Sequence, residues 1–169
     1  MMFLECLDGT CQGFVPPYWG GTECAEPDPM TEPMKVYFDL SGESGEFYRL
    51  PFPNDARISG GKIDMAGHAN PGVLIPELGN PVDDYLEVIE NDLNGFGLQS
   101  CVFFRFNRWP DTQTFDLMEN IYIIDIDPDS ADYGEMEWAR YRGDKARGKY
   151  ICNSWLSICP SVGRPLKEG

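Results

Sequence analysis

The sequence is poor in the residues that most catalytic and zinc sites require. Its 169 residues include a single histidine, His68, which is the only imidazole available as the base of a serine hydrolase. The stretch most similar to the Gly-x-Ser-x-Gly motif of serine hydrolases is GESGE at 42–46. It has Glu46 at the position of the motif's second glycine. No Cys-x-x-Cys pair occurs, and His68 lies far from every cysteine. The pattern therefore disfavours both a serine-type hydrolase and a zinc site.

Basic residues and long apolar runs are also scarce. The chain has 13 Lys and Arg against 28 Asp and Glu, for a net charge of -15. Such a surface repels phosphate backbones and anionic lipid, so we expect no nucleic-acid partner. No apolar run approaches the roughly 18–20 residues of a membrane-spanning helix, so we expect no membrane span.

The cysteines are even in number and divided between the two ends of the chain. Because tight zinc-ligand pairs are missing, disulfides are the better interpretation, and they predict an extracellular or cell-envelope location. No secretory signal is visible, since only MMFLE precedes the first cysteine. If all the cysteines pair internally, at least one bridge must join the N-terminal segment to the body. The six are Cys6, Cys11, Cys24, Cys101, Cys152 and Cys159.

Composition predicts one globular, mainly β domain. At 169 residues and 42% hydrophobic content the chain can bury a core without a metal. The 14 prolines and 18 glycines favour many turns and short elements. Residues 1–34 form a Pro/Gly/Cys-rich tail or linker with little periodicity, expected to be irregular, and 35–169 form the folded domain.

Hydrophobic periodicity predicts the strands. Apolar residues at every second position place Val36, Phe38 and Leu40 on one inward strand face, and FYRL at 47–50 is expected as a second strand. CVFFRF at 101–106 is expected as a central strand, polar only at Arg105. We further expect inward side chains in IYIIDID, a strand in MEWARYR at 136–142 and a last strand in YICNSWLSI at 150–158. The inward residues of IYIIDID are Tyr122, Ile124 and Ile126.

One helix is expected at about 81–94. Asn80 can cap it and Pro81 suits its first position, while Asn94-Gly95 supplies a stop. An acidic face, expected to be solvated, lies opposite a single apolar stripe. The stripe comprises Val82, Tyr85, Leu86, Ile89 and Leu93.

Five stretches carry a resemblance to a known family: LPFPND, GFG, VFFRF, IYIIDIDPDSADYG and CPSVGRPLKEG. They resemble the N-terminal domain of bacterial virulence-factor-type lipases, and they are similar to bacterial immunoglobulin-like modules of secreted and envelope proteins. The resemblance implies an immunoglobulin-like β-sandwich with one inserted α-helix. It also implies that the domain serves a downstream catalytic domain, which would carry the catalytic serine, or an envelope partner.

The same resemblance implies a missing element. In such modules a further strand follows a motif like PSVGRPLKEG, so the sandwich is expected to lack its last strand. Its neighbour would then be left as an open edge that could accept a strand from a partner or a second copy.

The most plausible metal ligands lie in an acidic loop. Alternating aspartates offer several hard oxygens to Ca²⁺. The loop departs from an EF-hand, because Ser130 replaces the glycine at its sixth position and Met136 replaces the bidentate Glu. An acidic turn between two strands is the competing interpretation. The candidate ligands are Asp125, Asp127, Asp129 and Asp132.

With Ca²⁺ bound in this loop, the chain would be a Ca²⁺-dependent binding or adhesion module, and a second alternative is a small glycosidase-like enzyme with an acid-pair mechanism. Asp55, Asp111 and Asp116 could supply its pair of carboxylates if the fold brought two of them together. Its aromatic walls would come from Trp109, Trp138 and Trp155. The leading prediction remains a non-catalytic accessory or positioning domain, with no catalytic residue and no cofactor. His68, within the turn HANPG, is expected to face solvent.

Overall fold

The computed structural model describes residues 4–7, 10–13, 19, 24, 32–72 and 76–167. Over these residues the protein is mainly β with one α-helix, as predicted. Strands β1 (Leu4–Leu7) and β2 (Thr10–Gly13) form an antiparallel hairpin. The remaining strands are β3 (Ile58–Ser59), β4 (Lys62–Ile63), β5 (Val102–Arg105), β6 (Ile123–Ile124), β7 (Met136–Glu137), β8 (Ala139–Asp144) and β9 (Trp155–Pro160).

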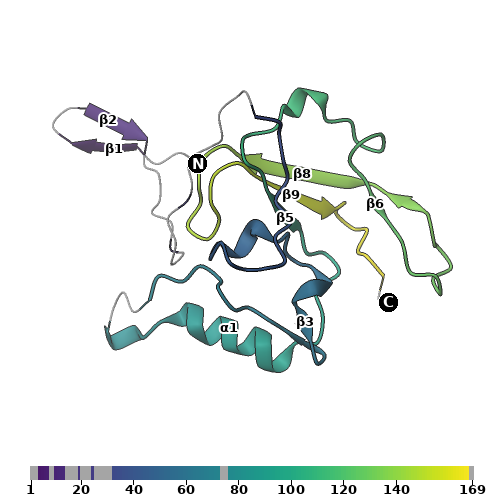
Figure 1. Cartoon of the computed structure of the whole chain (residues 1–169), viewed down its shortest axis with the longest axis horizontal. Coiled ribbons are helices and arrows are strands. Elements are labelled where there is room, and N and C mark those ends of the chain that lie inside the picture. The colour runs from purple at the N-terminus through teal and green to yellow at the C-terminus, as the bar shows by residue number, and fades with distance from the viewer. Residues whose placement is uncertain are drawn as a thin grey trace.

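The largest sheet contains β5, β9 and β8 in that order, all antiparallel (Figure 1). β9 lies in the middle, with Phe104 opposite Leu156 and Tyr141 opposite Ile158. The other edge of β5 carries isolated bridges from Phe52 and Val36. The segment 101–106, predicted to be a central strand, thus has neighbours on both sides. Within the three-stranded sheet, however, β9 is the middle strand.

The core lies between this sheet and helix α1 (Pro81–Asp92). Figure 1 shows the short 3₁₀ helix η1 (Phe47–Arg49) between the sheet above and α1 below. Phe47 and Tyr48 are both buried at its start. The prediction of a strand at 47–50 was wrong. Consecutive side chains of a strand point to opposite faces, whereas η1 directs the rings of both Phe47 and Tyr48 into the core. The core residues are Phe47, Tyr48, Ile63, Met65 and Ile151.

Two further predictions gave the correct alternation of side chains along the chain but assigned the wrong set of side chains to the core. Val36, Phe38 and Leu40 are exposed, and Tyr37 and Asp39 between them are half-buried. The inner side of this segment faces a charged part of the core, where the Arg49 guanidinium lies 4.3 Å from the centre of the Tyr37 ring.

The same reversal occurs around β6. Tyr122, Ile124 and Ile126 are exposed, whereas Ile121 is buried. Alternation establishes that two faces differ, but the side that meets the core depends on contacts with distant segments.

The helix prediction is confirmed, with its end at Asp92. Asn80 caps α1 by accepting a hydrogen bond from Val82, and Pro81 occupies the first turn. The buried stripe is narrower than expected, since Leu86 and Ile89 contact the core while Tyr85 is 72% exposed. One residue of its acidic face is also used by the fold, because Glu90 accepts a hydrogen bond from the main chain of Met65. The 3₁₀ helices are η1, η2 (Asp55–Arg57), η3 (Pro76–Leu78) and η4 (Thr112–Thr114).

Two disulfides connect distant parts of the chain. Cys24–Cys152 joins the N-terminal segment to the body, which is the kind of link that the cysteine distribution predicted. Cys101–Cys159 joins the chain beside β5 to β9. Cys6 and Cys11 are opposite each other in the β1–β2 register, inside the segment expected to be irregular. The rest of the predicted tail lies largely outside the described residues.

No helix among the described residues combines the length and the apolar character that crossing a membrane demands.

Candidate binding hollow and the charged core beside it

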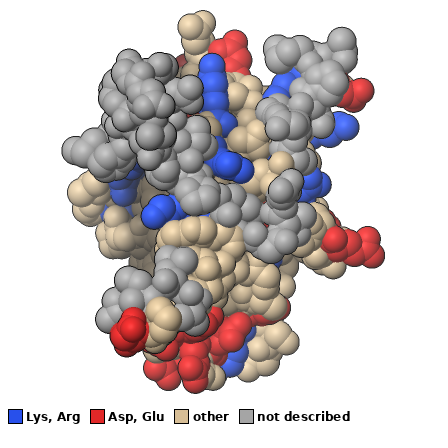
Figure 2. All heavy atoms as spheres, turned by 90° about the vertical axis from the view of Figure 1, so that its left-hand side faces the viewer, with Lys and Arg blue, Asp and Glu red and all other residues tan. Residues whose placement is uncertain are grey.

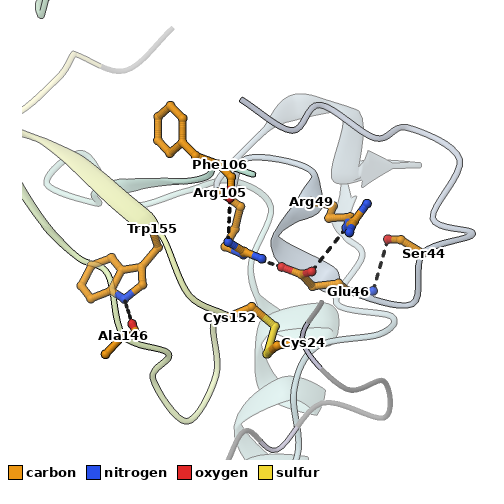
Figure 3. Close-up of a disulfide and its surroundings, with 9 residues drawn as sticks. All are labelled: Cys24, Ser44, Glu46, Arg49, Arg105, Phe106, Ala146, Cys152 and Trp155. Atoms are coloured by element: carbon orange, nitrogen blue, oxygen red, sulfur yellow. Dashed lines mark hydrogen bonds and ion pairs between the residues drawn. A yellow bond between two sulfur atoms is a disulfide. The ribbon is translucent and has the colours of Figure 1, made fainter. Parts of the chain in front are cut away.

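A buried ion pair lies next to the Cys24–Cys152 disulfide (Figure 3). Arg105, 2% exposed, donates from Nε to Glu46 Oε1 at 2.5 Å, and the other carboxylate oxygen of Glu46 lies 3.3 Å from Arg49 Nε. Arg105 also donates to the carbonyl oxygen of Phe106. A buried charge must be paired and hydrogen-bonded, so this arrangement fixes β5 against the chain that precedes η1.

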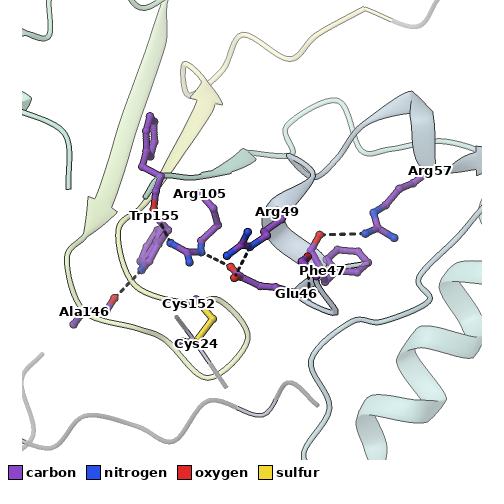
Figure 4. Close-up of polar contacts among 11 residues, drawn as sticks. Cys24, Glu46, Phe47, Arg49, Arg57, Arg105, Ala146, Cys152 and Trp155 are labelled. Atoms are coloured by element: carbon purple, nitrogen blue, oxygen red, sulfur yellow. Dashed lines mark hydrogen bonds and ion pairs between the residues drawn. A yellow bond between two sulfur atoms is a disulfide. The ribbon is translucent and has the colours of Figure 1, made fainter. Parts of the chain in front are cut away.

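A second guanidinium covers the other side of η1. Arg57 lies 3.7 Å from the centre of the Phe47 ring and donates to the Phe47 carbonyl oxygen at 3.1 Å (Figure 4). It also donates to the carbonyl oxygen of Ala66. Partial burial lowers the pKa of Arg57 below its usual range, against the opposing attraction of Asp64. Arginine is ionised at any physiological pH, so Arg57 acts as a fixed cation that ties η1 to the loop after β4.

A hollow with aromatic walls lies beside η1. It measures about 310 Å³ and is lined by residues of η1, the loop after β4, β5 and the loop before β9. His68 contacts the rings of Phe47 and Tyr48 at centroid distances of 5.0 and 5.9 Å. His68 was expected to face solvent, but these ring contacts leave it half-buried. The lining residues are Tyr48, His68, Phe103, Gly148, Lys149, Tyr150 and Ile151. This set is called the aromatic hollow below.

Partial burial favours the neutral form of the His68 imidazole. Loss of solvent lowers its pKa below the ordinary histidine value, and the positive charge of Arg57 lowers it further, while the nearby backbone of Ala69 works in the opposite direction. Nε2 is 3.3 Å from the Tyr48 hydroxyl. Nδ1 is buried and makes no hydrogen bond of normal geometry with a described residue. The hollow thus combines aromatic surfaces with one neutral, hydrogen-bonding pair.

The N-terminal segment is attached beside the hollow. Trp19 donates its main-chain N–H to Lys149 at 2.8 Å and accepts from Asn70 at 3.1 Å. Its indole meets the Tyr150 ring edge-on at 5.2 Å, and the Lys149 ammonium lies 4.5 Å from the indole centre. Together with the Cys24–Cys152 bond, these contacts hold the 148–152 loop that forms one wall of the hollow.

The acidic loop uses its carboxylates to hold its own turns. Asp125 accepts from the Ser130 hydroxyl at 2.6 Å and from the Asp127 main chain at 2.9 Å. Asp127 accepts from the main chain of Asp129, and Asp132 contacts the Lys167 ammonium. Within the described part of the chain, no group of three or more acidic, histidine or cysteine side chains has the geometry to hold a metal ion. The contacts seen here are those of an acidic hairpin turn, and Ca²⁺ binding by the four aspartates is the alternative that a titration tests.

The carboxylates of the glycosidase alternative serve different elements. Asp111 caps η4 by accepting from Gln113, whereas Asp55 lines a separate hollow of about 450 Å³ with Asp125 and Lys167. Asp116 is exposed, and its main-chain N–H donates to Asn120.

The three tryptophans are also dispersed. Trp155 contacts Phe103 and donates its indole N–H to Ala146 at 3.2 Å, Trp109 lies against Gly143, and Trp138 is 51% exposed. None of them is among the described residues that line the hollow containing Asp55.

Sequence reasoning missed Tyr48, Tyr150 and the Glu46–Arg105 pair. One signal was present, because Arg105 is the single charge within the apolar run CVFFRF. Such a residue requires a buried partner of opposite charge. The identity of that partner, 59 positions away, has no local signature.

Acidic side chains gather at the end of the molecule where α1 lies, as Figure 2 shows. Basic side chains appear higher on the same face. Charged side chains are therefore unevenly distributed over the described part of this face, and the part around α1 is unfavourable for anionic partners.

Comparisons with protein-family models, with curated proteins and with solved structures found no match.

Proposed function

We propose that this chain is a non-catalytic accessory or positioning module of an exported protein, with the immunoglobulin-like character that its sequence resembles. The aromatic hollow is its contact point for a neighbouring domain. Two disulfides support an oxidising location. The proposal includes a downstream catalytic domain or envelope partner as the neighbour.

The proposal rests mainly on the hydrogen bonds that the polar side chains make. Several polar side chains of the described residues satisfy main-chain groups or each other. Asn54 caps η2, Asp111 caps η4, and Asp125 accepts from both Asp127 and Ser130. A framework built in this way favours rigidity, which is what a positioning module supplies.

The aromatic hollow supplies the binding element of the proposal. Ligand sites are concave, mostly apolar and equipped with a few placed polar groups. The hollow has this composition, with the Tyr48–His68 pair as its polar part. Its size suits one aromatic or branched apolar side chain rather than an extended substrate. We therefore assign it to an aromatic side chain presented by a neighbouring protein domain.

Nuclear magnetic resonance tests this assignment directly, because the single histidine gives one unambiguous imidazole signal. Titration with 4-methylphenol, which represents a tyrosine side chain, should shift that signal saturably at millimolar concentration. Tyr150→Ala should abolish the shift, whereas Tyr133→Ala should not, since Tyr133 is 62% exposed outside the hollow. An unshifted imidazole, or equal effects of both variants, contradicts the assignment.

Enzyme assays test the non-catalytic part separately. Chromogenic esters and glycosides should show no turnover above background with the full chain. Turnover that a single substitution such as His68→Ala or Asp55→Asn abolishes would overturn the proposal.

A further inference from the structure

Residues 35–37 pair with 105–107 at the end of β5, and Asp39 donates its main-chain N–H to Arg49, so the chain from 34 to 40 leaves an open edge on its other side. Tyr37 donates its main-chain N–H to Arg105 at 2.8 Å, and Lys35 accepts from Asn107 at 3.1 Å. Successive main-chain groups of an extended chain point to opposite sides, so those of Val36 and Phe38 point away from β5. Among the described residues, the main-chain N–H groups of Val36 and Phe38 have no main-chain partner.

The side chains on this edge are unusually apolar for an exposed position. Proteins protect open edges with charges, prolines or bulges. Here four alternate residues are apolar and all are exposed. They are Met34 at 48%, Val36 at 49%, Phe38 at 60% and Leu40 at 67%. An exposed row of this kind marks an interaction site.

The segment MKVYFDL is self-complementary about Tyr37 when it is read in opposite directions. In an antiparallel pair of two copies centred there, Val36 faces Phe38, Met34 faces Leu40 and Lys35 faces Asp39. Val36 and Phe38, whose main-chain groups point outward, become the hydrogen-bonded pair. Lys35 and Asp39 fall at a position where opposite side chains are closest, and their charges are opposite.

We propose that two copies of this chain associate edge to edge through residues 34–40, antiparallel about a two-fold axis at Tyr37. Such an interface is isologous, because the same strand contributes to both sides. It extends the sheet β8–β9–β5 through the 34–40 segment into the second copy. This association is independent of the aromatic hollow, which lies outside the paired segment.

The contact is small, and this sets the expected behaviour. A standard interface uses about 20–30 residues on each side, many more than this segment supplies. The dimer should therefore be concentration-dependent and should dissociate on dilution. Sedimentation over a concentration series at fixed salt measures its dissociation constant.

A charge-reversal experiment tests the register. Lys35→Asp places Asp opposite Asp39 twice in each dimer, and Asp39→Lys places Lys35 opposite Lys twice. Each variant alone should dimerise about tenfold more weakly. An equimolar mixture should restore association, because both cross-strand pairs are again of opposite charge. The two variants shift the net charge in opposite directions, so a general charge effect cannot weaken both.

A second pair of variants tests the apolar row. Phe38→Lys should weaken dimerisation at least as much as either charge reversal. Val162→Lys is the matched control, because Val162 is 82% exposed and lies outside the segment. The inference is overturned by a wild-type chain that stays monomeric at every concentration, by a mixture that does not recover, or by equal effects of the two lysine variants.

Discussion

Glu46 and Asp125 are two carboxylates that the fold uses in opposite ways. Both oxygens of Glu46 are engaged by guanidinium groups inside the core, the closest from a residue 59 positions away. Asp125 is solvent-accessible, and its two hydrogen bonds come from residues within five positions. The core region thus depends on contacts between distant segments, while the β6–β7 hairpin depends on its own neighbours. The two regions should therefore differ in stability, in response to mutation and in predictability.

The largest effect should come from removing the cation in the core. Arg105→Met leaves Glu46 buried with only its longer contact to Arg49, which should lower the free energy of unfolding by about 3–5 kcal/mol. Urea denaturation measures this loss. Arg142→Met is the control, because Arg142 is exposed on β8 and should change stability little. A loss for Arg105→Met no greater than that for the control would remove the ion pair from the account.

Removing the long-range disulfide should have the next largest effect. The variant Cys24→Ala/Cys152→Ala should lose about 2–5 kcal/mol. Cys101→Ala/Cys159→Ala should lose about 0.7 kcal/mol less on chain entropy alone, because it closes 58 positions rather than 128. Denaturation of both variants checks the order. The reverse order would show that local packing around β5 and β9 outweighs the tie to the N-terminal segment.

Filling the close contact between Gly143 and Trp155 should have an intermediate effect on stability. A Cβ at Gly143 would lie 2.4 Å from the Trp155 carbonyl oxygen and 2.9 Å from the Trp109 ring. Gly143→Ala should therefore cost about 1–3 kcal/mol through overpacking. Gly95→Ala meets no atom within 4 Å and should be close to neutral. Equal melting temperatures for the two variants would contradict the close packing of β8 against β9.

The pH dependence of stability should report the half-buried His68. The folded-state pKa of His68 is lowered by burial and by Arg57, so the unfolded chain binds the proton more readily. Stability should thus rise with pH between the folded pKa and about 6.5, the ordinary histidine value, and level off above it. His68→Gln should remove this slope. An imidazole that titrates above its ordinary value would reverse the sign and refute the burial argument.

The smallest effect should come from the hairpin. Asp125→Asn weakens two hydrogen bonds at an exposed turn, so global stability should barely change while amides near Ser130 exchange faster. The Ser130 hydroxyl and the Asp127 main chain lower the pKa of Asp125, so any stabilisation should be present above the ordinary Asp value and be lost as the pH falls below it. Calorimetric titration with Ca²⁺ should give no heat at millimolar concentration. Measurable heat that Asp125→Asn removes would restore the calcium alternative.

Local features of the sequence could be predicted, and relations between distant features could not. The α1 helix followed from Asn80, Pro81 and the apolar spacing, because caps and periodicity act within a few residues. A disulfide between the N-terminal segment and the body followed from the cysteine distribution, on the condition that all six cysteines pair internally. The inward faces around Val36 and Ile124 were assigned wrongly, since the partner segment determines which face is buried.

The candidate site shows the same limit. The sequence shows Arg105 as a lone charge in an expected strand, but it gives no sign that Glu46 is its partner. His68 was placed in solvent because a turn sequence such as HANPG is usually exposed. The rings of Phe47 and Tyr48 that cover it come from a segment that was expected to be a strand.

Native-state hydrogen exchange tests most directly whether the core contacts give this protein a rigid framework. The slowest amides should be those of β5 and β9 beside the Glu46–Arg105 pair, and they should open only with global unfolding. Amides of 123–137 should exchange through local openings of much lower free energy. Protection in the hairpin equal to or greater than that in β5 and β9 would contradict the account.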